Sequence, residues 1–271
     1  MKIKDLTPEQ LRQFIQHHHV KEYALIDVRQ PGEYEQGHIP GSRLLPLPEL
    51  VRSMGALPTD RRLVFYCRSG GRSTAAASMV ADEGIGAGDP ANLVGGMLAW
   101  DGGVAADYPN VQLFDWRAAP SDMLITAMNL EKGALNFYTH VSEQYQDHPW
   151  VGVFSNLAKA ELGHARTVYH FWREIETDGD EFDTVFDRLS GEVLEGGMKL
   201  SRAIESLCEI KGRACLHLIE TALKIEYAAF DLYQTMAERV TMPDAREAFI
   251  TIAQAEKAHM RALARAIDDC D

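Results

Sequence analysis

The feature that most constrains the fold is an internal repeat in the second half of the chain. Residues 130–143 align with residues 225–238, and residues 154–166 align with residues 249–261, both at an offset of 95 positions. One offset that serves two separated blocks is difficult to obtain by chance, so we interpret the blocks as two copies of a helix pair. Two such pairs predict a four-helix bundle whose crossover connection lies within residues 177–215.

The repeat aligns four glutamates and two histidines. They are Glu131 with Glu226, Glu161 with Glu256, and His164 with His259. The spacing places each glutamate inside an apolar helical stripe; Glu161, for example, shares a face with Leu157 and Ala165. Because an unpaired buried carboxylate is very unfavourable, four of them need protons or cations, and the two histidines favour a metal.

The spacing within the repeat also predicts how metal ions would be bound. Residues three apart are neighbours on one helix face, so each Glu-x-x-His pair can bind one ion, while Glu131 and Glu226 complete or bridge the two sites. This is the ligand pattern of di-iron and di-manganese carboxylate bundles. One Glu-x-x-His sequence alone would be compatible with a solvated surface, but two copies on apolar faces favour a metal centre.

With these motifs, residues 120–271 resemble the ferritin-like superfamily, specifically its rubrerythrin-type domains. The resemblance implies two iron ions per chain (manganese or another divalent metal is the alternative), a reduced centre that reacts with hydrogen peroxide or dioxygen, and a homodimer. Rubrerythrins commonly carry a further glutamate one turn after the third-helix ligand, where this chain has Ala229. The chain also lacks the paired Cys-x-x-Cys motifs of a rubredoxin domain, so an external electron donor is expected.

The first half of the chain follows a different pattern. Apolar runs at 23–28, 61–67 and 91–96 are separated by glycine-containing turns, and an alanine-rich helical stretch, 73–84, lies between the second and third runs. This alternation is typical of an α/β domain built on a parallel sheet.

The change of pattern divides the 271 residues into parts long enough to bury separate cores. We expect an α/β domain over residues 1–108, a linker over 109–119 and an all-α four-helix bundle over 120–271.

The sequence CRSGGRS, residues 67–73, follows an apolar strand and precedes the helical stretch. Successive backbone N–H groups of such a loop, backed by a helix N-terminus, form an anion-binding site. A thiolate is an anion, so we expect the loop, helped by Arg68 and Arg72, to lower the pKa of Cys67. A lowered pKa makes this cysteine a candidate nucleophile at neutral pH.

Residues 1 to about 105 resemble the rhodanese superfamily. The segment IDVRQPGEYEQGHIPGSRLLPL matches its first signature, CRSGGRS its active-site loop and LVGGMLAW its closing segment. The resemblance implies a sulfurtransferase that carries sulfur as a persulfide on Cys67 and passes it from a small-molecule donor to a thiol acceptor. The loop from Cys67 to Arg72 has six residues, which fits a persulfide, whereas the related phosphatases use a loop one residue longer.

The rhodanese resemblance also assigns roles around the cysteine. Arg72 and Arg68 would attract anionic donors, and the loop that holds the terminal sulfur consists of Ser69, Gly70, Gly71 and Ser73. Four polar residues of the first signature are expected to fix loops by hydrogen bonding rather than to act in catalysis: Asp27, Arg29, Glu33 and His38.

Charge and composition limit the partners and the location. The formal net charge of −13 disfavours contact with a phosphate backbone or an anionic membrane, so neither nucleic acid nor membrane is expected as a partner. The first ten residues lack the apolar stretch of a signal peptide, which predicts a cytoplasmic protein. The remaining cysteines, Cys208, Cys215 and Cys270, are interpreted as isolated buried residues without a disulfide framework.

These patterns favour a two-domain protein of sulfur and redox chemistry, in which sulfur transfer at Cys67 accompanies reduction of peroxide or dioxygen at a di-iron centre. One alternative is that the bundle only stores metal or forms a dimer. Another is that the first domain senses sulfur status through the persulfide state of Cys67.

Overall fold

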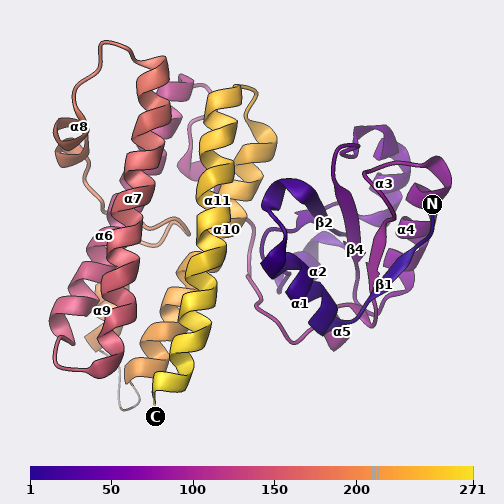
Figure 1. Ribbon diagram of the computed structural model, residues 1–271, viewed down its shortest axis with the longest axis horizontal. Helices are drawn as coiled ribbons and strands as arrows, with labels where there is room; N and C mark the ends of the chain where they lie inside the picture. The colour runs from indigo at the N-terminus through magenta and orange to yellow at the C-terminus, as the bar shows by residue number, and fades with distance from the viewer. Residues whose placement is uncertain (209–211, 213, 271) are drawn as a thin grey trace. The chain divides into compact units, whose positions relative to one another are not determined.

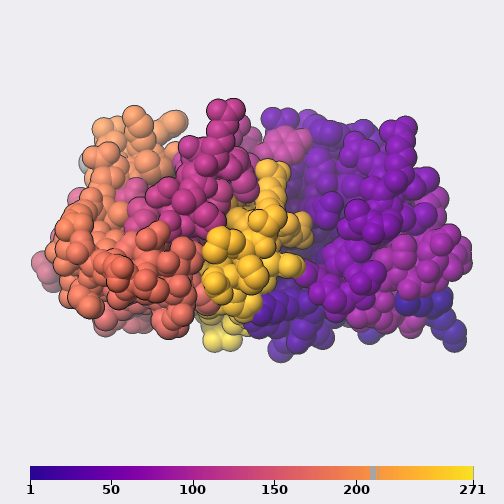
Figure 2. Space-filling view, turned by 90° about the horizontal axis from the view of Figure 1, so that it is seen from above, coloured from indigo at the N-terminus to yellow at the C-terminus, as the bar shows by residue number. Residues whose placement is uncertain are grey.

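The computed structural model describes residues 1–208, 212 and 214–270. They form two compact units, Met1–Tyr108 and Pro109–Asp271, which are described separately. Figure 2 shows the first unit in indigo and violet and the second in magenta to yellow. An α/β domain is therefore followed by a helical one, as the sequence predicts.

The first domain is built on a five-stranded parallel sheet with strand order β1-β5-β4-β2-β3 (Figure 1). The strands are β1 (Lys4–Leu6), β2 (Tyr23–Asp27), β3 (Arg43–Leu44), β4 (Arg62–Tyr66) and β5 (Ala91–Leu93). The helices are α1 (Pro8–His17), α2 (Pro31–Glu35), α3 (Leu47–Ser53), α4 (Gly71–Glu83) and α5 (Gly96–Ala99).

Both faces of this sheet are buried, which explains why its strands are continuous apolar runs in the sequence. In β4, Leu63 and Phe65 contribute to one core together with Ala76 and Ala77 of α4. The alternate residues of the strand, such as Tyr66, belong to a second core on the other face.

The second domain consists of long helices that pack in pairs. The helices are α6 (Pro120–Gln144), α7 (Gly152–Ile175), α10 (Ala214–Arg239) and α11 (Pro243–Ala266), with the short helices α8 (Phe182–Arg188) and α9 (Leu200–Cys208) in the crossover. Figure 1 shows α6 beside α7 and α10 beside α11, and α7 also contacts α11. Within the described part of the chain, no helix has the length and apolar character needed to traverse a lipid bilayer.

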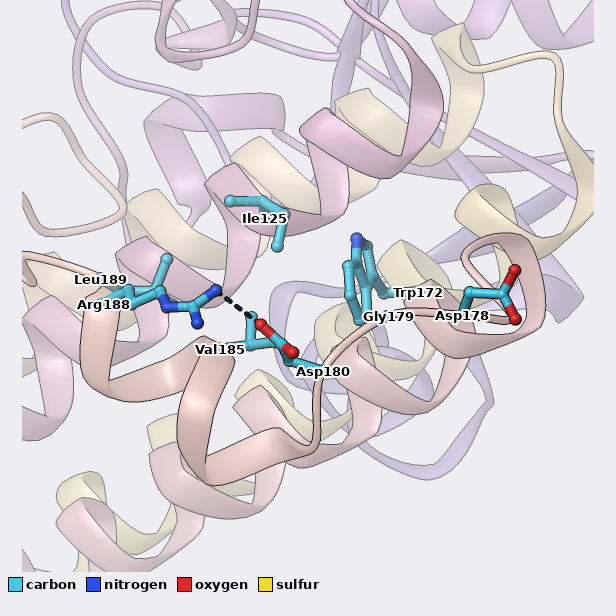
Figure 3. A pocket seen from close by; sticks show the side chains of 8 residues that line it. All are labelled: Ile125, Trp172, Asp178, Gly179, Asp180, Val185, Arg188 and Leu189. Carbon is cyan, nitrogen blue, oxygen red and sulfur yellow. Dashed lines mark hydrogen bonds and ion pairs between the residues drawn. The ribbon is translucent and has the colours of Figure 1, made fainter.

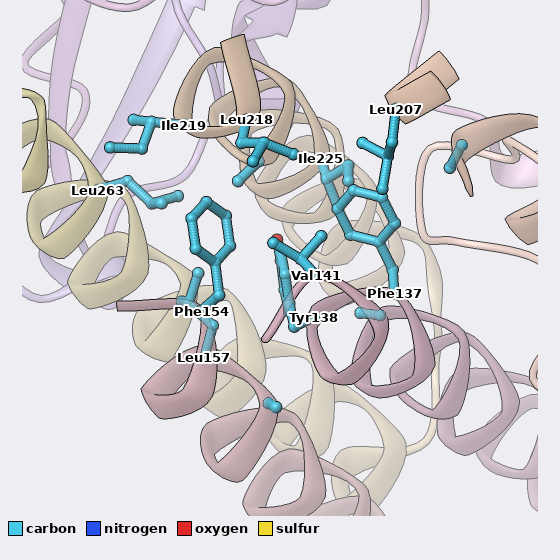
Figure 4. Close-up of a cluster of buried hydrophobic side chains, with 14 of the residues drawn as sticks. Phe137, Tyr138, Val141, Phe154, Leu157, Leu207, Leu218, Ile219, Ile225 and Leu263 are labelled. Atoms are coloured by element: carbon cyan, nitrogen blue, oxygen red, sulfur yellow. The ribbon is translucent and has the colours of Figure 1, made fainter. Parts of the chain in front are cut away.

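All four long helices contribute to one buried apolar cluster. Figure 4 shows Tyr138 of α6, Phe154 of α7, Ile225 of α10 and Leu263 of α11 converging on it. Tyr138, Phe154 and Leu263 each lie seven residues, two helical turns, from the repeated glutamate of their own helix, so the apolar core continues directly into the polar cluster described below.

The segment 109–119 packs on the helical domain instead of forming a free linker. Phe114 is only 2% exposed, and its ring meets that of Phe249 edge to face. Trp116 lies under the guanidinium of Arg239. The aromatic side chains of this segment thus attach it to the bundle, which corrects the expectation of a linker.

The structure also corrects the interpretation of two cysteines. Cys215, near the start of α10, and Cys270, in the last helical turn, form a disulfide, with their Cα atoms 5.4 Å apart. The two helices pack along each other, so the start of α10 and the end of α11 meet, although the cysteines are separated by 55 residues. The interpretation of Cys208 lies outside the residues whose side chains are described.

Breaking this disulfide is expected to destabilise the helical domain. A cross-link between residues 55 positions apart restricts the unfolded chain, so reduction should lower the free energy of unfolding by about 2–4 kcal/mol. Urea unfolding of the whole chain, followed by far-ultraviolet circular dichroism with and without reductant, measures the change. The Cys215→Ser/Cys270→Ser variant should be insensitive to reductant, and equal stability of the wild type under both conditions would contradict the assignment.

Candidate functional sites

Cys67 follows β4 directly and lies in the loop that leads to α4. Its Sγ accepts hydrogen bonds from the backbone N–H of Gly70 at 3.1 Å and from the hydroxyl of Ser73 at 3.4 Å. Gly70 has a φ of +102°, a left-handed conformation that favours glycine and lets the loop turn back over the sulfur. The loop is therefore shaped around this one atom.

The same loop tunes the acidity of the thiol. Burial alone would raise the pKa of Cys67, but hydrogen bonds from the Ser73 side chain and from the backbone of Ser73, Ser69 and Gly70 outweigh it. The pKa lies below the ordinary value of a thiol, so the thiolate is favoured.

The closing segment packs directly against the cysteine loop. The backbone N–H of Met97 donates to the carbonyl of Cys67 at 2.8 Å, and that of Leu98 donates to the carbonyl of Arg68 at 3.0 Å. A Cβ at Gly96 would lie 2.2 Å from the carbonyl oxygen of Cys67, so only glycine permits this approach. The glycines of LVGGMLAW thus hold the loop in shape.

The two arginines of the loop have different surroundings. Arg72 forms a two-pronged ion pair with Glu33, with both N–O distances 2.8 Å, and its hydrogen bonds hold the pKa of Glu33 down to about 2. Arg68 lies exposed beside the cysteine. The largest causes that lower the pKa of Cys67 are hydrogen bonds within the loop, and the charge of Arg72 also interacts with this cysteine.

The residues of the first signature fix loops, as expected. Arg29 forms a buried ion pair with Asp27 at 2.7 Å and donates to the carbonyl of Gly37. A ring nitrogen of His38 hydrogen-bonds the carbonyl of Tyr34, on whose ring the imidazole also stacks. None of these contacts involves the sulfur of Cys67.

The second candidate site lies among the four long helices. All six predicted metal ligands are brought together there, and none is more than 9% exposed. The helices supply Glu131 (α6), Glu161 and His164 (α7), Glu226 (α10), and Glu256 and His259 (α11).

The Nδ1 atom of His164 faces three carboxylate oxygens. They are Oε2 of Glu161 at 2.9 Å, Oε2 of Glu131 at 3.2 Å and Oε1 of Glu256 at 3.3 Å. Donor atoms bound to one metal ion at about 2.1 Å lie about 3 Å apart, so these three distances from the imidazole nitrogen match the spacing within a coordination shell.

The Nδ1 atom of His259 faces a matching set. It consists of Oε2 of Glu226 and Oε2 of Glu256, both at 3.1 Å, and Oε1 of Glu161 at 3.3 Å. Glu161 and Glu256 therefore present one oxygen to each histidine and lie in the shared positions, whereas Glu226 belongs to one side only.

Two tyrosines hold the outer carboxylates. The hydroxyl of Tyr138 donates to Oε1 of Glu226, and the hydroxyl of Tyr233 donates to Oε1 of Glu131, so each copy of the repeat orients a glutamate of the other. Both tyrosines are fully buried core residues whose hydroxyls are hydrogen-bonded. Each contact leaves the other oxygen of the glutamate directed at a histidine.

The electrostatics of this cluster fit bound cations. Burial raises the pKa of Glu131 to about 8. Burial alone would lower the pKa of His259, but the surrounding glutamates raise it well above the ordinary value. Oε2 of Glu131 and both oxygens of Glu256 accept no hydrogen bond from the described residues. Buried carboxylate oxygens that lack a hydrogen-bond donor, next to imidazole nitrogens, form a suitable set of ligand atoms for divalent metal ions.

The structure adds a carboxylate that the sequence analysis missed. Glu195, in the crossover between α8 and α9, is 2% exposed and lies next to Glu131 and Glu161, with one oxygen of each within 4.8 Å of the others. Glu195 lies outside the aligned blocks of the repeat, so the repeat contained no signal for it.

Figure 3 shows a separate pocket beside α6, α7 and α8. It contains no predicted site residue, and an ion pair between Arg188 and Asp180 lies at its edge. The lining residues are Ile125, Trp172, Asp178, Gly179, Asp180, Val185, Arg188 and Leu189. Neither the residues of the Cys67 loop nor the predicted metal ligands line this pocket.

Comparison with known proteins assigns a family to each domain. The Rhodanese-like domain family model matches residues 7–102, which include the Cys67 loop, and the Rubrerythrin family model matches residues 217–271, which include Glu226, Glu256 and His259.

Several curated relatives are named sulfurtransferases. A sulfurtransferase of Allochromatium vinosum is 40% identical over 80 residues, 30% of this chain and 73% of that protein. The putative sulfurtransferase YtwF of Bacillus subtilis is 33% identical over 102 residues, 38% of this chain and 94% of that protein. The thiosulfate sulfurtransferase GlpE of Pseudoalteromonas translucida is 31% identical over 81 residues, 30% of this chain and 75% of that protein. The chain therefore belongs to the rhodanese-like family through its first domain and carries a rubrerythrin domain in its second.

Proposed function

We propose that the first domain transfers sulfur through a persulfide on Cys67. The observation that carries this proposal is the single sulfur atom at the centre of a loop whose backbone N–H groups and Ser73 hydroxyl all favour its anionic form. A relative named as a thiosulfate sulfurtransferase makes thiosulfate the first donor to test.

In the proposed reaction, the Cys67 thiolate attacks the outer sulfur of thiosulfate. The sulfur–sulfur bond of the donor breaks, and sulfite leaves with the bonding electron pair. An acceptor thiolate then attacks the terminal sulfur of the persulfide, which transfers that sulfur and regenerates the Cys67 thiolate. The N–H groups of the loop stabilise negative charge on the terminal sulfur, and exposed Arg68 attracts the anionic donor.

We propose that the second domain binds two divalent metal ions, with iron favoured by the rubrerythrin match. Glu131 and His164 would hold one ion, Glu226 and His259 the other, and Glu161 and Glu256 would bridge them. Two observations support this arrangement. Buried carboxylate oxygens lack hydrogen-bond partners, and the distances from each histidine Nδ1 to the carboxylate oxygens around it are about 3 Å. Tyr138 and Tyr233 would orient the outer glutamates through their hydrogen bonds.

Bound iron would supply the electrons that reduce hydrogen peroxide, with two electrons and two protons per molecule giving two molecules of water. An external donor must return the electrons. The chain's own contribution is to hold the carboxylates and imidazoles in place and to surround them with apolar side chains. Dioxygen is the second oxidant to test, and a homodimer is the expected assembly.

The sulfur-transfer proposal predicts that sulfurtransferase activity is lost without Cys67 and that its rate depends on pH in a specific way. Cys67→Ser should lower thiosulfate:cyanide sulfurtransferase activity at least about 1,000-fold. The wild-type rate should rise with pH as the thiolate forms and level off above a midpoint that lies below the ordinary thiol value of about 8.5. Ser73→Ala should move this midpoint to higher pH and lower the rate at neutral pH roughly tenfold, since it removes a hydrogen bond to the anion.

Ser78→Ala, on the same helix as Ser73 but outside the loop, is the matched control and should keep the wild-type profile. Sulfurtransferase activity that survives in Cys67→Ser would exclude this residue as the carrier.

The metal-centre proposal predicts loss of peroxide turnover. In a Cys67→Ser background, which removes thiol oxidation at that site, the iron-loaded and reduced protein should consume hydrogen peroxide. Adding Glu161→Ala should reduce this rate at least about 100-fold, because a shared ligand is removed. Glu174→Ala, at an exposed position of α7, is the control. Equal peroxide consumption by the Glu161→Ala and Glu174→Ala proteins would reject the assignment.

A further inference from the structure

Glu195 is a buried carboxylate that belongs to none of the long helices. It lies in the crossover between α8 and α9 and is 2% exposed. Its Oε2 atom accepts no hydrogen bond from the described part of the chain. A charged group in this position needs a proton or a cation, because burial without a partner is very unfavourable.

The backbone around Glu195 forms a tight turn. The N–H of Leu194 donates to the carbonyl of Met198 at 2.9 Å, and the N–H of Gly197 donates to the carbonyl of Leu194 at 2.7 Å. Gly197 has a φ of +81°, which favours glycine at this position. The residues on both sides of Glu195 are therefore fixed by backbone hydrogen bonds.

Helix α6 anchors this turn. Asn129 accepts a hydrogen bond from the backbone N–H of Gly191 at 2.9 Å, and Leu194 is fully buried in the core of the bundle. A Cβ at Gly133 would lie 2.1 Å from the carbonyl oxygen of Val193, so the turn contacts α6 where that helix has no side chain. These contacts with α6 hold Glu195 at a defined position.

The Glu195 carboxylate lies on one side of the proposed metal centre. One oxygen each of Glu131, Glu161 and Glu195 lie within 4.8 Å of one another, and Glu131 is the outer carboxylate on the His164 side. Three ionised carboxylates at this spacing repel one another unless a proton or a cation lies among them. Among the described residues, the groups that could hold a metal ion include no corresponding additional carboxylate on the His259 side.

We propose that Glu195 is a seventh protein ligand of the centre, which binds the divalent ion on the Glu131–His164 side. It is supplied by the crossover loop and makes the two ion sites chemically unequal. This proposal rests on the di-metal function proposed above.

Cobalt(II) is a suitable probe, because its visible absorption reports coordination without turnover. Titration of the whole metal-free protein should show two ions bound in the wild type. In Glu195→Gln, one of the two should bind at least about tenfold more weakly, with an altered absorption spectrum. Glu192→Gln, at an exposed position of the same loop, should match the wild type. Wild-type affinities and spectrum in Glu195→Gln would overturn the proposal.

Unfolding temperatures distinguish ligation from a structural role. The metal-free Glu195→Gln protein should be as stable as the wild type or more stable, because an unpaired buried carboxylate is removed, while its stabilisation by cobalt should be smaller. A metal-free variant that is less stable, with undiminished stabilisation by cobalt, would show a structural role and reject ligation. A wild type that binds no cobalt would reject the di-metal function itself, whereas binding unaffected by Glu195→Gln rejects only this inference.

Discussion

The unfavourable burial of carboxylates is the constraint on which the helical domain depends. Five glutamates lie at most 2% exposed in its centre: Glu131, Glu161, Glu195, Glu226 and Glu256. Two protonated histidines would leave three of their five negative charges unbalanced, whereas two divalent cations beside neutral histidines leave one. Apolar packing alone cannot retain such a cluster, so protons or cations must accompany the buried carboxylates.

The first domain stabilises its buried negative charge in a different way. There a single anion, the Cys67 thiolate, is stabilised by hydrogen bonds that its own loop donates, so no counter-ion has to be buried with it. Arg72, which the sequence predicts as a source of positive charge beside the sulfur, also forms an ion pair with Glu33. The loop is thereby tied to α2 of the same domain while the sulfur relies on the backbone.

The sequence was informative where a periodic or repeated signal exists. The six predicted ligand residues were selected because they form three pairs at the same offset and lie on apolar stripes, and Cys67 was selected because its loop directly follows a strand. Glu195 has no repeat partner, and its position depends on the contact between a crossover turn and Gly133. The disulfide between Cys215 and Cys270 depends on how two helices pack, which no local pattern encodes. Likewise, Phe114 has a place in the helical core only because Phe249 faces it.

The central claim, that buried carboxylates and histidines hold two metal ions, is tested most directly by metal analysis of anaerobically purified protein. The wild type should contain about two iron ions per chain, and the Glu161→Ala/Glu256→Ala variant, which lacks both shared carboxylates, should contain almost none while keeping its helical content. A well-folded wild type without metal, or a double variant with the full metal content, would contradict this account.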